Sequence, residues 1–188
     1  LFLAAFIKGV DEYHEMLRCC VSYPGNDHRL GGNEAPPAII SIFLGDELTA
    51  ILDAIIQGTE YVDITKKKLT IGVDTLPEIP QDTTDRNRTS PLAFTGNKFE
   101  FRMLGSSQSI ASPNVVLNTI MAEELRQFAD ILEKADDFQS ALQKLLHDTF
   151  TAHQRIIFNG NGYDDAWVQE AKRRGLANLR DTVDCMPA

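Results

Sequence analysis

The feature that most constrains this chain is a strict alternation of charged and apolar residues from Lys98 to Met103, which reads Lys-Phe-Glu-Phe-Arg-Met. Successive side chains of a β-strand point to opposite faces, so this segment predicts a strand with one charged and one apolar face. On the charged face, the Cα atoms of Glu100 and Arg102 would lie ~7 Å apart. Taken alone, the pattern favours a half-exposed strand whose charges form a salt-bridge ladder.

More cations precede this strand. Residues 74–97 combine prolines, polar turn residues and two arginines, Arg86 and Arg88, which predicts an irregular loop of the kind that carries functional side chains. Several cations close to one carboxylate have the chemistry to bind phosphate, a metal ion and a carboxylate substrate. The loop and the strand together therefore form a candidate site.

A second segment, residues 26–37, reads Asn-Asp-His-Arg-Leu-Gly-Gly-Asn-Glu-Ala-Pro-Pro. The two adjacent glycines can adopt positive φ, whereas Pro36 and Pro37 stiffen the end of the segment. This composition predicts a hinged flap that carries one acid, Glu34, close to one cation, Arg29.

The two segments, H-R-L-G-G-N-E-A-P-P and D-R-N-R-T-S-P-L-A-F-T-G-N-K-F-E-F-R, resemble motifs of the glutamine synthetase family, and specifically of its type III branch. S-P-N-V-V-L-N-T-I-M-A-E-E-L and R-I-I-F-N-G-N-G-Y extend the resemblance through nearly the whole chain. It implies an α+β fold: residues 1–134 would be the C-terminal part of a catalytic domain, with curved antiparallel strands backed by helices. Residues 135–188 would be a helical C-terminal extension. Because no initiator Met is present, we expect the chain to begin in mid-domain, as a fragment of the enzyme.

The resemblance also implies an activity. Glutamine synthetases are glutamate–ammonia ligases that use ATP and Mg²⁺ or Mn²⁺ to join glutamate and ammonia through a γ-glutamyl phosphate intermediate. Both steps build negative charge on transferring oxygens, which cations fixed beforehand can stabilise. The resemblance also implies a role for each motif residue. Glu34 would accept a proton from ammonium, Arg88 would contact the phosphate, and Arg29 and Arg102 would bind glutamate. Lys98 would contact the nucleotide, and Glu100 would be a metal ligand.

The sequence departs from the commoner branches of the family at three places, one of which is the flap segment, which is one residue shorter than usual. Residues 91–94 replace a stretch in which a second arginine follows the Asn-Arg pair, so one nucleotide phosphate contact is unassigned, with Arg86 as the candidate. Lys98 stands where many members carry an arginine, which keeps the charge but loses the planar fork. One carboxylate cannot hold a divalent ion, so the other ligands are expected upstream and the isolated fragment is expected to be inactive.

Composition narrows the partners and the compartment. The net charge is −9, and the short basic runs 66–68 and 172–174 are typical of solvated surfaces, so we expect no nucleic acid partner. The apolar N-terminal stretch is too short for a membrane span, so we expect no membrane association. Three cysteines without a spaced framework indicate a reducing, cytoplasmic setting. The resemblance implies a homo-oligomeric ring.

Patterning predicts the remaining elements. We expect helices at about 1–20, 46–57, 112–132, 137–158 and 164–174, a buried extended segment at 38–44, and paired strands at 61–65 and 69–73. Gly58 and Gly175 would end helices, as would the Asn-Gly-Asn-Gly run at 159–162. Ser112 is the expected N-cap of its helix, Phe2 and Phe138 are placed on inner stripes, and Glu123 and Glu124 are read as exposed helix acids.

Two other functions stay open. A related γ-glutamyl ligase with another amine as acceptor fits the same motifs, because they read glutamate and phosphate more than the acceptor. A catalytically silent scaffold relative is the second alternative. The presence of Arg29, Glu34, Arg88, Glu100 and Arg102 argues against it, since a structural role would not require them.

Overall fold

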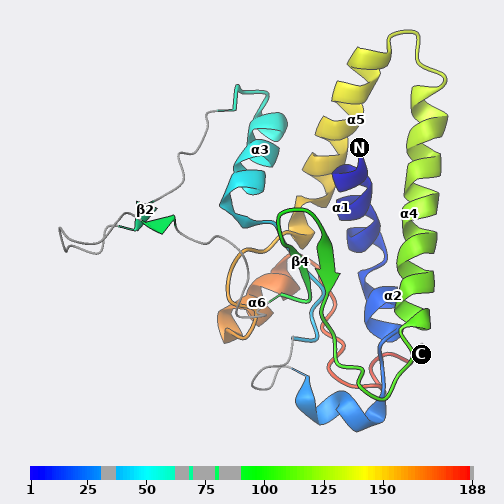
Figure 1. The fold of residues 1–188 in the computed structure, drawn as a ribbon, viewed down its shortest axis with the longest axis vertical. Helices are drawn as coiled ribbons and strands as arrows, with labels where there is room; N and C mark the ends of the chain where they lie inside the picture. Colours follow the sequence, from blue (N-terminus) through cyan, green and yellow to red (C-terminus); the bar gives the residue numbers. More distant parts are fainter. Residues whose placement is uncertain (31–36, 62–67, 70–78, 81–89, 187–188) are drawn as a thin grey trace.

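The computed structural model describes residues 1–30, 37–61, 68–69, 79–80 and 90–186. Helices cover much of this length, with a small three-stranded sheet beside them, so the predicted α+β class is confirmed (Figure 1). In chain order the elements are α1 Phe2–Glu12, α2 His14–Cys19, the 3₁₀ helix η1 Pro24–Arg29, β1 Ile42–Phe43, α3 Gly45–Gln57, β2 Lys68–Leu69, β3 Ile79–Pro80, β4 Leu92–Phe94, β5 Phe99–Phe101, α4 Ala111–Leu132, α5 Phe138–His153, the 3₁₀ helix η2 Gln154–Ile156, and α6 Asp165–Arg173.

The sheet has the strand order β1-β4-β5. β4 pairs antiparallel with β5, with Ala93 opposite Glu100, and parallel with β1, with Leu92 opposite Ile42. The prediction of an irregular loop over 74–97 is therefore wrong for 92–94, because these apolar residues are covered on both edges by neighbouring strands. The sheet is also mixed rather than wholly antiparallel.

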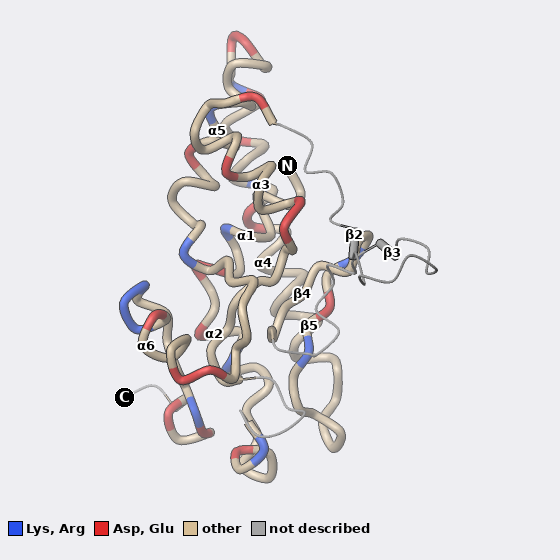
Figure 2. Tube along the Cα trace, turned by 90° about the vertical axis from the view of Figure 1, so that its left-hand side faces the viewer, with Lys and Arg blue, Asp and Glu red and all other residues tan. Residues whose placement is uncertain are grey.

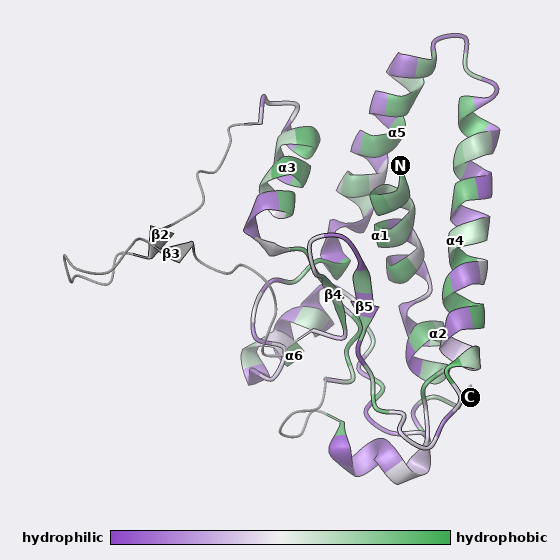
Figure 3. Cartoon of the chain, in the orientation of Figure 1, coloured by the Kyte–Doolittle hydropathy of each residue, from purple (hydrophilic) through white to green (hydrophobic). Residues whose placement is uncertain are grey.

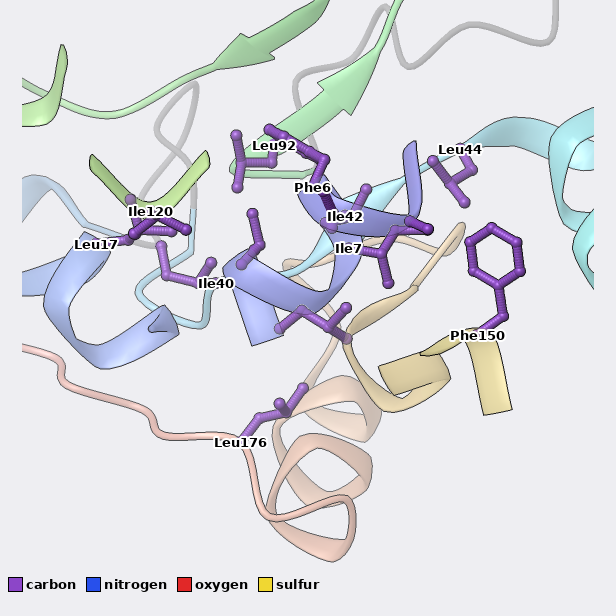
Figure 4. Packing of buried hydrophobic residues seen from close by; sticks show 14 of the residues in the cluster. Phe6, Ile7, Leu17, Ile40, Ile42, Leu44, Leu92, Ile120, Phe150 and Leu176 are labelled. Atoms are coloured by element: carbon purple, nitrogen blue, oxygen red, sulfur yellow. The ribbon is translucent and has the colours of Figure 1, made fainter. Parts of the chain in front are cut away.

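Helix α1 lies at the centre of the helical layer and packs against both α4 and α5 (Figures 1 and 3). Ala4 and Ala5 are fully buried, and a Cβ added to Gly9 would lie 2.4 Å from Ile120 Cγ2, so small residues let α1 approach α4 closely. Phe6 and Ile7 of α1 share a core with residues of β1, β4 and α5; Figure 4 shows Phe6, Ile7, Ile42, Leu44, Leu92 and Phe150 in it.

The core therefore crosses the expected boundary between residues 134 and 135, which falls in the turn between α4 and α5. That boundary stays a prediction. The inner-stripe placements of Phe2 and Phe138 are wrong, because their exposed fractions are 60% and 49%. Both residues begin a helix, where the periodic stripe extends beyond the packed layer.

Helix ends follow the sequence signals at several points. Gly58 and Gly175 close α3 and α6 with positive φ, as predicted. The first helix, expected at about 1–20, is interrupted at Tyr13 and becomes α1 and α2. Ser112 is not the N-cap of α4: the helix begins at Ala111, whose N–H donates to Ser109 Oγ over 3.2 Å.

Helix α5 ends at His153, earlier than the predicted residue 158. The chain turns through η2 and runs beside β1, where the Phe158 N–H donates to the Ile42 carbonyl over 2.9 Å. Asn159 then accepts the N–H groups of Leu44 and Gly45 at 3.0 and 3.1 Å. The Asn-Gly-Asn-Gly run therefore follows the extended connection instead of ending a helix, and Asn159 holds the start of α3.

The predicted strands at 61–65 and 69–73 lie largely outside the described residues. The pair that is described joins β2 to β3 in antiparallel register, with Leu69 opposite Ile79. No described helix combines the length and apolar character needed to cross a membrane.

Glu124 is fully buried, so its reading as an exposed acid is wrong, whereas Glu123 pairs with Arg126 on the surface as expected. Lys8 of α1 extends to the Glu124 carboxylate and also donates to Gln127 Oε1 over 2.9 Å. Burial raises the pKa of Glu124 and the Lys8 ammonium opposes that rise. The buried Glu124 of α4 is therefore paired with a cation 116 residues away in sequence.

We expect Lys8→Met to destabilise the fold by ~3 kcal/mol, because it leaves a buried carboxylate without its cation. Glu124 would then bind a proton more readily in the folded than in the unfolded state, so the variant should lose stability as the pH rises above the ordinary Glu pKa of 4.5. Urea unfolding at several pH values measures both effects. Glu123→Gln, which removes an exposed pair, is the matched control and should change stability by less than ~1 kcal/mol.

Candidate active site

The charged face predicted for the strand is present on β5. The ring of Phe99 stacks on Phe6 with centroids 3.9 Å apart, and Phe101 and Met103 also pack against the core. The intervening Glu100 and Arg102 carry charge on the other face, with exposed side-chain fractions of 36% and 17%. The alternation therefore separates core and charge as expected.

Glu100 is held between two cations. Arg102 donates to Glu100 Oε2 from Nε at 3.1 Å and from Nη2 at 3.0 Å, and Lys98 Nζ lies 3.2 Å from Oε1. The hydrogen bonds from Arg102 and then Lys98 hold the pKa of Glu100 below its usual range, so the carboxylate is ionised at neutral pH. The salt-bridge ladder that the pattern alone favoured is thus real (Figure 2, adjacent red and blue segments at β5).

The backbone fixes this cluster firmly. The Arg102 N–H donates to the Pro91 carbonyl over 2.7 Å, and Glu100 lies opposite the fully buried Ala93 of β4. The turn between β4 and β5 contains Gly96 at φ 95°, a conformation that favours glycine. The β4–β5 hairpin and the residues that flank β5 therefore carry Lys98, Glu100 and Arg102.

Arg29 lies in a different place. It is exposed at the end of η1, the blue segment at the lower end of Figure 1, whereas the β4–β5 hairpin lies in the middle of the molecule. His28, the neighbour of Arg29 in sequence, is likewise exposed on η1. Glu34 and Arg88 lie outside the described residues. The structure thus brings three of the six candidate residues together and leaves Arg29 apart from them.

The described residues do not complete a metal site. Within those ranges there is no group of three or more His, Cys, Asp or Glu side chains that could hold an ion. Glu100 offers carboxylate oxygens, the ligand type that Mg²⁺ and Mn²⁺ prefer, but both oxygens face cations. His14 cannot contribute, because its Nδ1 lies 2.7 Å from the Asp11 carbonyl and its Nε2 accepts the Ala177 N–H.

Comparison with known proteins agrees with the motifs. Residues 141–188 match the model of the glutamine synthetase C-terminal domain. The chain is 51% identical over 189 residues to the type-3 glutamine synthetase of Dictyostelium discoideum, with 99% of the chain and 26% of that protein covered. It is 45% identical to the glutamine synthetase of Butyrivibrio fibrisolvens, with 100% of the chain and 27% of that protein covered. It is 44% identical to the glutamine synthetase of Bacteroides fragilis (strain YCH46), with 95% of the chain and 25% of that protein covered.

The chain therefore belongs to the glutamine synthetase family. Its similarity to the type-3 glutamine synthetase runs over nearly its whole length, which places it in the type III branch. The chain spans about a quarter of the length of the curated relatives that it matches.

Proposed function

We propose that this chain forms part of the active site of a glutamate–ammonia ligase that makes glutamine with ATP. The observation that carries the proposal is the charged face at β5, where Arg102 and Lys98 flank an ionised Glu100. The position of these residues in the family's motifs and the identity to named glutamine synthetases support it.

Each residue has a chemical role in this proposal. Arg102 already directs two donors at a carboxylate, and the same planar fork can bind the carboxylate of glutamate. Lys98 supplies a mobile point charge beside the nucleotide. Arg29 would meet glutamate from η1, and Arg88 would contact the phosphate that leaves ATP. Glu34 would accept a proton from ammonium, which its negative charge also attracts.

Metal binding needs residues beyond those described. In this proposal Glu100 gives one ligand to Mg²⁺ or Mn²⁺, and carboxylates elsewhere in the full-length protein give the others. A bound divalent ion would neutralise charge on the phosphates of ATP. We further propose a cytoplasmic, homo-oligomeric ring that acts on glutamate, ammonia and ATP, without nucleic acid or membrane partners.

An assay of the full-length protein with ATP, glutamate and several amines tests the proposal. Ammonium should give the highest kcat/KM, above methylamine, ethanolamine and putrescine, with one ADP formed per amide. A preference for an organic amine would indicate the related γ-glutamyl ligase, and absence of turnover with every amine would indicate a silent scaffold. The 188-residue chain alone should give no glutamine above background, because the motifs assign it a single metal ligand, Glu100, and one carboxylate does not hold a divalent ion.

A further inference from the structure

Residues 176–186, called here the C-terminal strap, run along α2 and η1 and end beside them (Figure 1). Two contacts fasten the strap to α2. The Ala177 N–H donates to His14 Nε2 over 3.2 Å, and Arg18 Nε donates to the Leu179 carbonyl over 2.8 Å. Both His14 and Arg18 are buried, so these contacts lie in the packed part of the molecule.

The strap then reaches η1 through Thr182. Asp27 accepts the Thr182 N–H at 3.0 Å on one carboxylate oxygen and the Thr182 hydroxyl at 2.9 Å on the other. A contact near the end of the strap follows, where the Cys19 thiol donates to the Cys185 carbonyl over 3.4 Å. Asp27, two positions before Arg29, is thus hydrogen-bonded by both the main chain and the side chain of Thr182.

Hydrogen bonds within η1 stabilise it only weakly. It is a six-residue 3₁₀ helix, a conformation with poor hydrogen-bond geometry that is rarely stable at this length. Its own backbone bonds include the Asn26 N–H to the Tyr23 carbonyl at 2.9 Å and a longer one from Leu30 to Asp27 at 3.4 Å. Its orientation therefore depends on contacts from outside, and Thr182 makes two of them.

The strap also shares a cavity with both ends of the segment that follows η1. Leu30 and Pro37 line a cavity of about 600 Å³, together with Asn178, Arg180 and Asp181 of the strap. The strap therefore lines the same cavity as Leu30 and Pro37, the described residues on either side of that segment.

We infer that the C-terminal strap is a positioning element for Arg29, with Thr182 as its positioning residue. This inference rests on the proposed function, in which Arg29 binds glutamate. Thr182 acts through its two hydrogen bonds to Asp27, and so through η1. Its loss should weaken the binding of glutamate while the chemical step and the binding of ATP are unchanged.

The test compares Thr182→Val with Thr182→Ser in the full-length protein. Valine keeps the shape and the main-chain bond but removes the hydroxyl donor, whereas serine keeps the donor. Loss of a hydrogen bond to a carboxylate should raise KM for glutamate about tenfold, with kcat and KM for ATP changed less than about twofold. Thr182→Ser should restore a KM close to that of the unsubstituted protein.

Amide hydrogen exchange separates failure of this inference from failure of the proposed function. Thr182→Val should speed exchange at the amides of Asn26 in η1 and of Leu30 directly after it, with no change in α4 and α5. Faster exchange with an unchanged KM for glutamate would overturn the positioning role. Unchanged exchange would show that the Thr182 hydroxyl does not hold η1, and would overturn the inference at that step. A full-length protein that makes no glutamine would overturn the proposed function, while the exchange result would still decide whether the strap holds η1.

Discussion

Glu34→Gln in the full-length protein is expected to slow glutamine formation by ~10²–10⁴-fold, the range for loss of a positioned proton acceptor. Glutamine keeps the shape and the hydrogen bonding of the side chain but removes the charge that attracts ammonium and the base that deprotonates it. The γ-glutamyl phosphate should still form, because that step needs the cations and not Glu34. Water should then intercept more of the intermediate, so free phosphate should exceed glutamine.

Parallel measurement of glutamine and free phosphate checks this expectation. Glu133→Gln, at an exposed position after α4, is the matched control and should leave both rates unchanged. A near-normal glutamine rate with tight coupling to phosphate in Glu34→Gln would remove Glu34 from the chemistry and leave it a surface acid.

The second large effect is expected on β5, where three substitutions should affect three different kinetic parameters. Arg102→Ala should raise KM for glutamate by ~10–100-fold, the cost of losing a charge-assisted hydrogen bond to a carboxylate. Glu100→Ala should raise the Mg²⁺ concentration needed for activity and lower kcat. Lys98→Ala should chiefly raise KM for ATP, and by less, because its exposed ammonium is a single screened charge.

The ion pairs among these residues make controls necessary. Arg102→Lys keeps the charge but loses the fork, so it should restore only part of the affinity for glutamate. Glu100→Gln keeps the size of the side chain, and it should still show the raised Mg²⁺ requirement. Equal changes in all kinetic parameters for all three alanine variants would mean that the cluster is a structural salt-bridge ladder with no division of roles.

Local signals in the sequence predicted several features of the fold. The alternation at β5 separates apolar from charged side chains because a strand that lies on a core exposes every second residue. Gly58 and Gly175 end their helices because the left-handed conformation is open to glycine at little cost. The predicted helix starts at 137 and 164 fall one residue before α5 and α6, because Asp137 and Asp164 cap these helices by accepting main-chain N–H groups.

Features set by distant partners could not be predicted in this way. Glu124 is buried because Lys8 lies across the helix interface, and nothing in the sequence around Glu124 indicates that cation. Helix α5 ends early because residues 157 and 158 pair with Ile42. The strap contact between Asp27 and Thr182 joins positions 155 apart, so no motif indicated it.

Local sequence signals also predicted only part of the candidate site. Strand geometry placed Lys98, Glu100 and Arg102 together, since residues two apart share a face. Arg29 lies on η1, which is bonded to the strap through Asp27 and Thr182, and these contacts belong to the tertiary structure. The roles of all six candidate residues rest on motif position and stay predictions.

The central claim is that this chain belongs to an active site that phosphorylates the γ-carboxylate of glutamate before ammonia attacks it. The most direct test gives the full-length protein glutamate labelled with ¹⁸O in the γ-carboxylate, together with ATP, Mg²⁺ and ammonium, and follows the label by mass spectrometry. A carboxylate oxygen that attacks the γ-phosphorus leaves with phosphate when ammonia takes its place on the acyl carbon. One ¹⁸O is expected in the inorganic phosphate for each glutamine formed, and phosphate released without the label would contradict a γ-glutamyl phosphate intermediate.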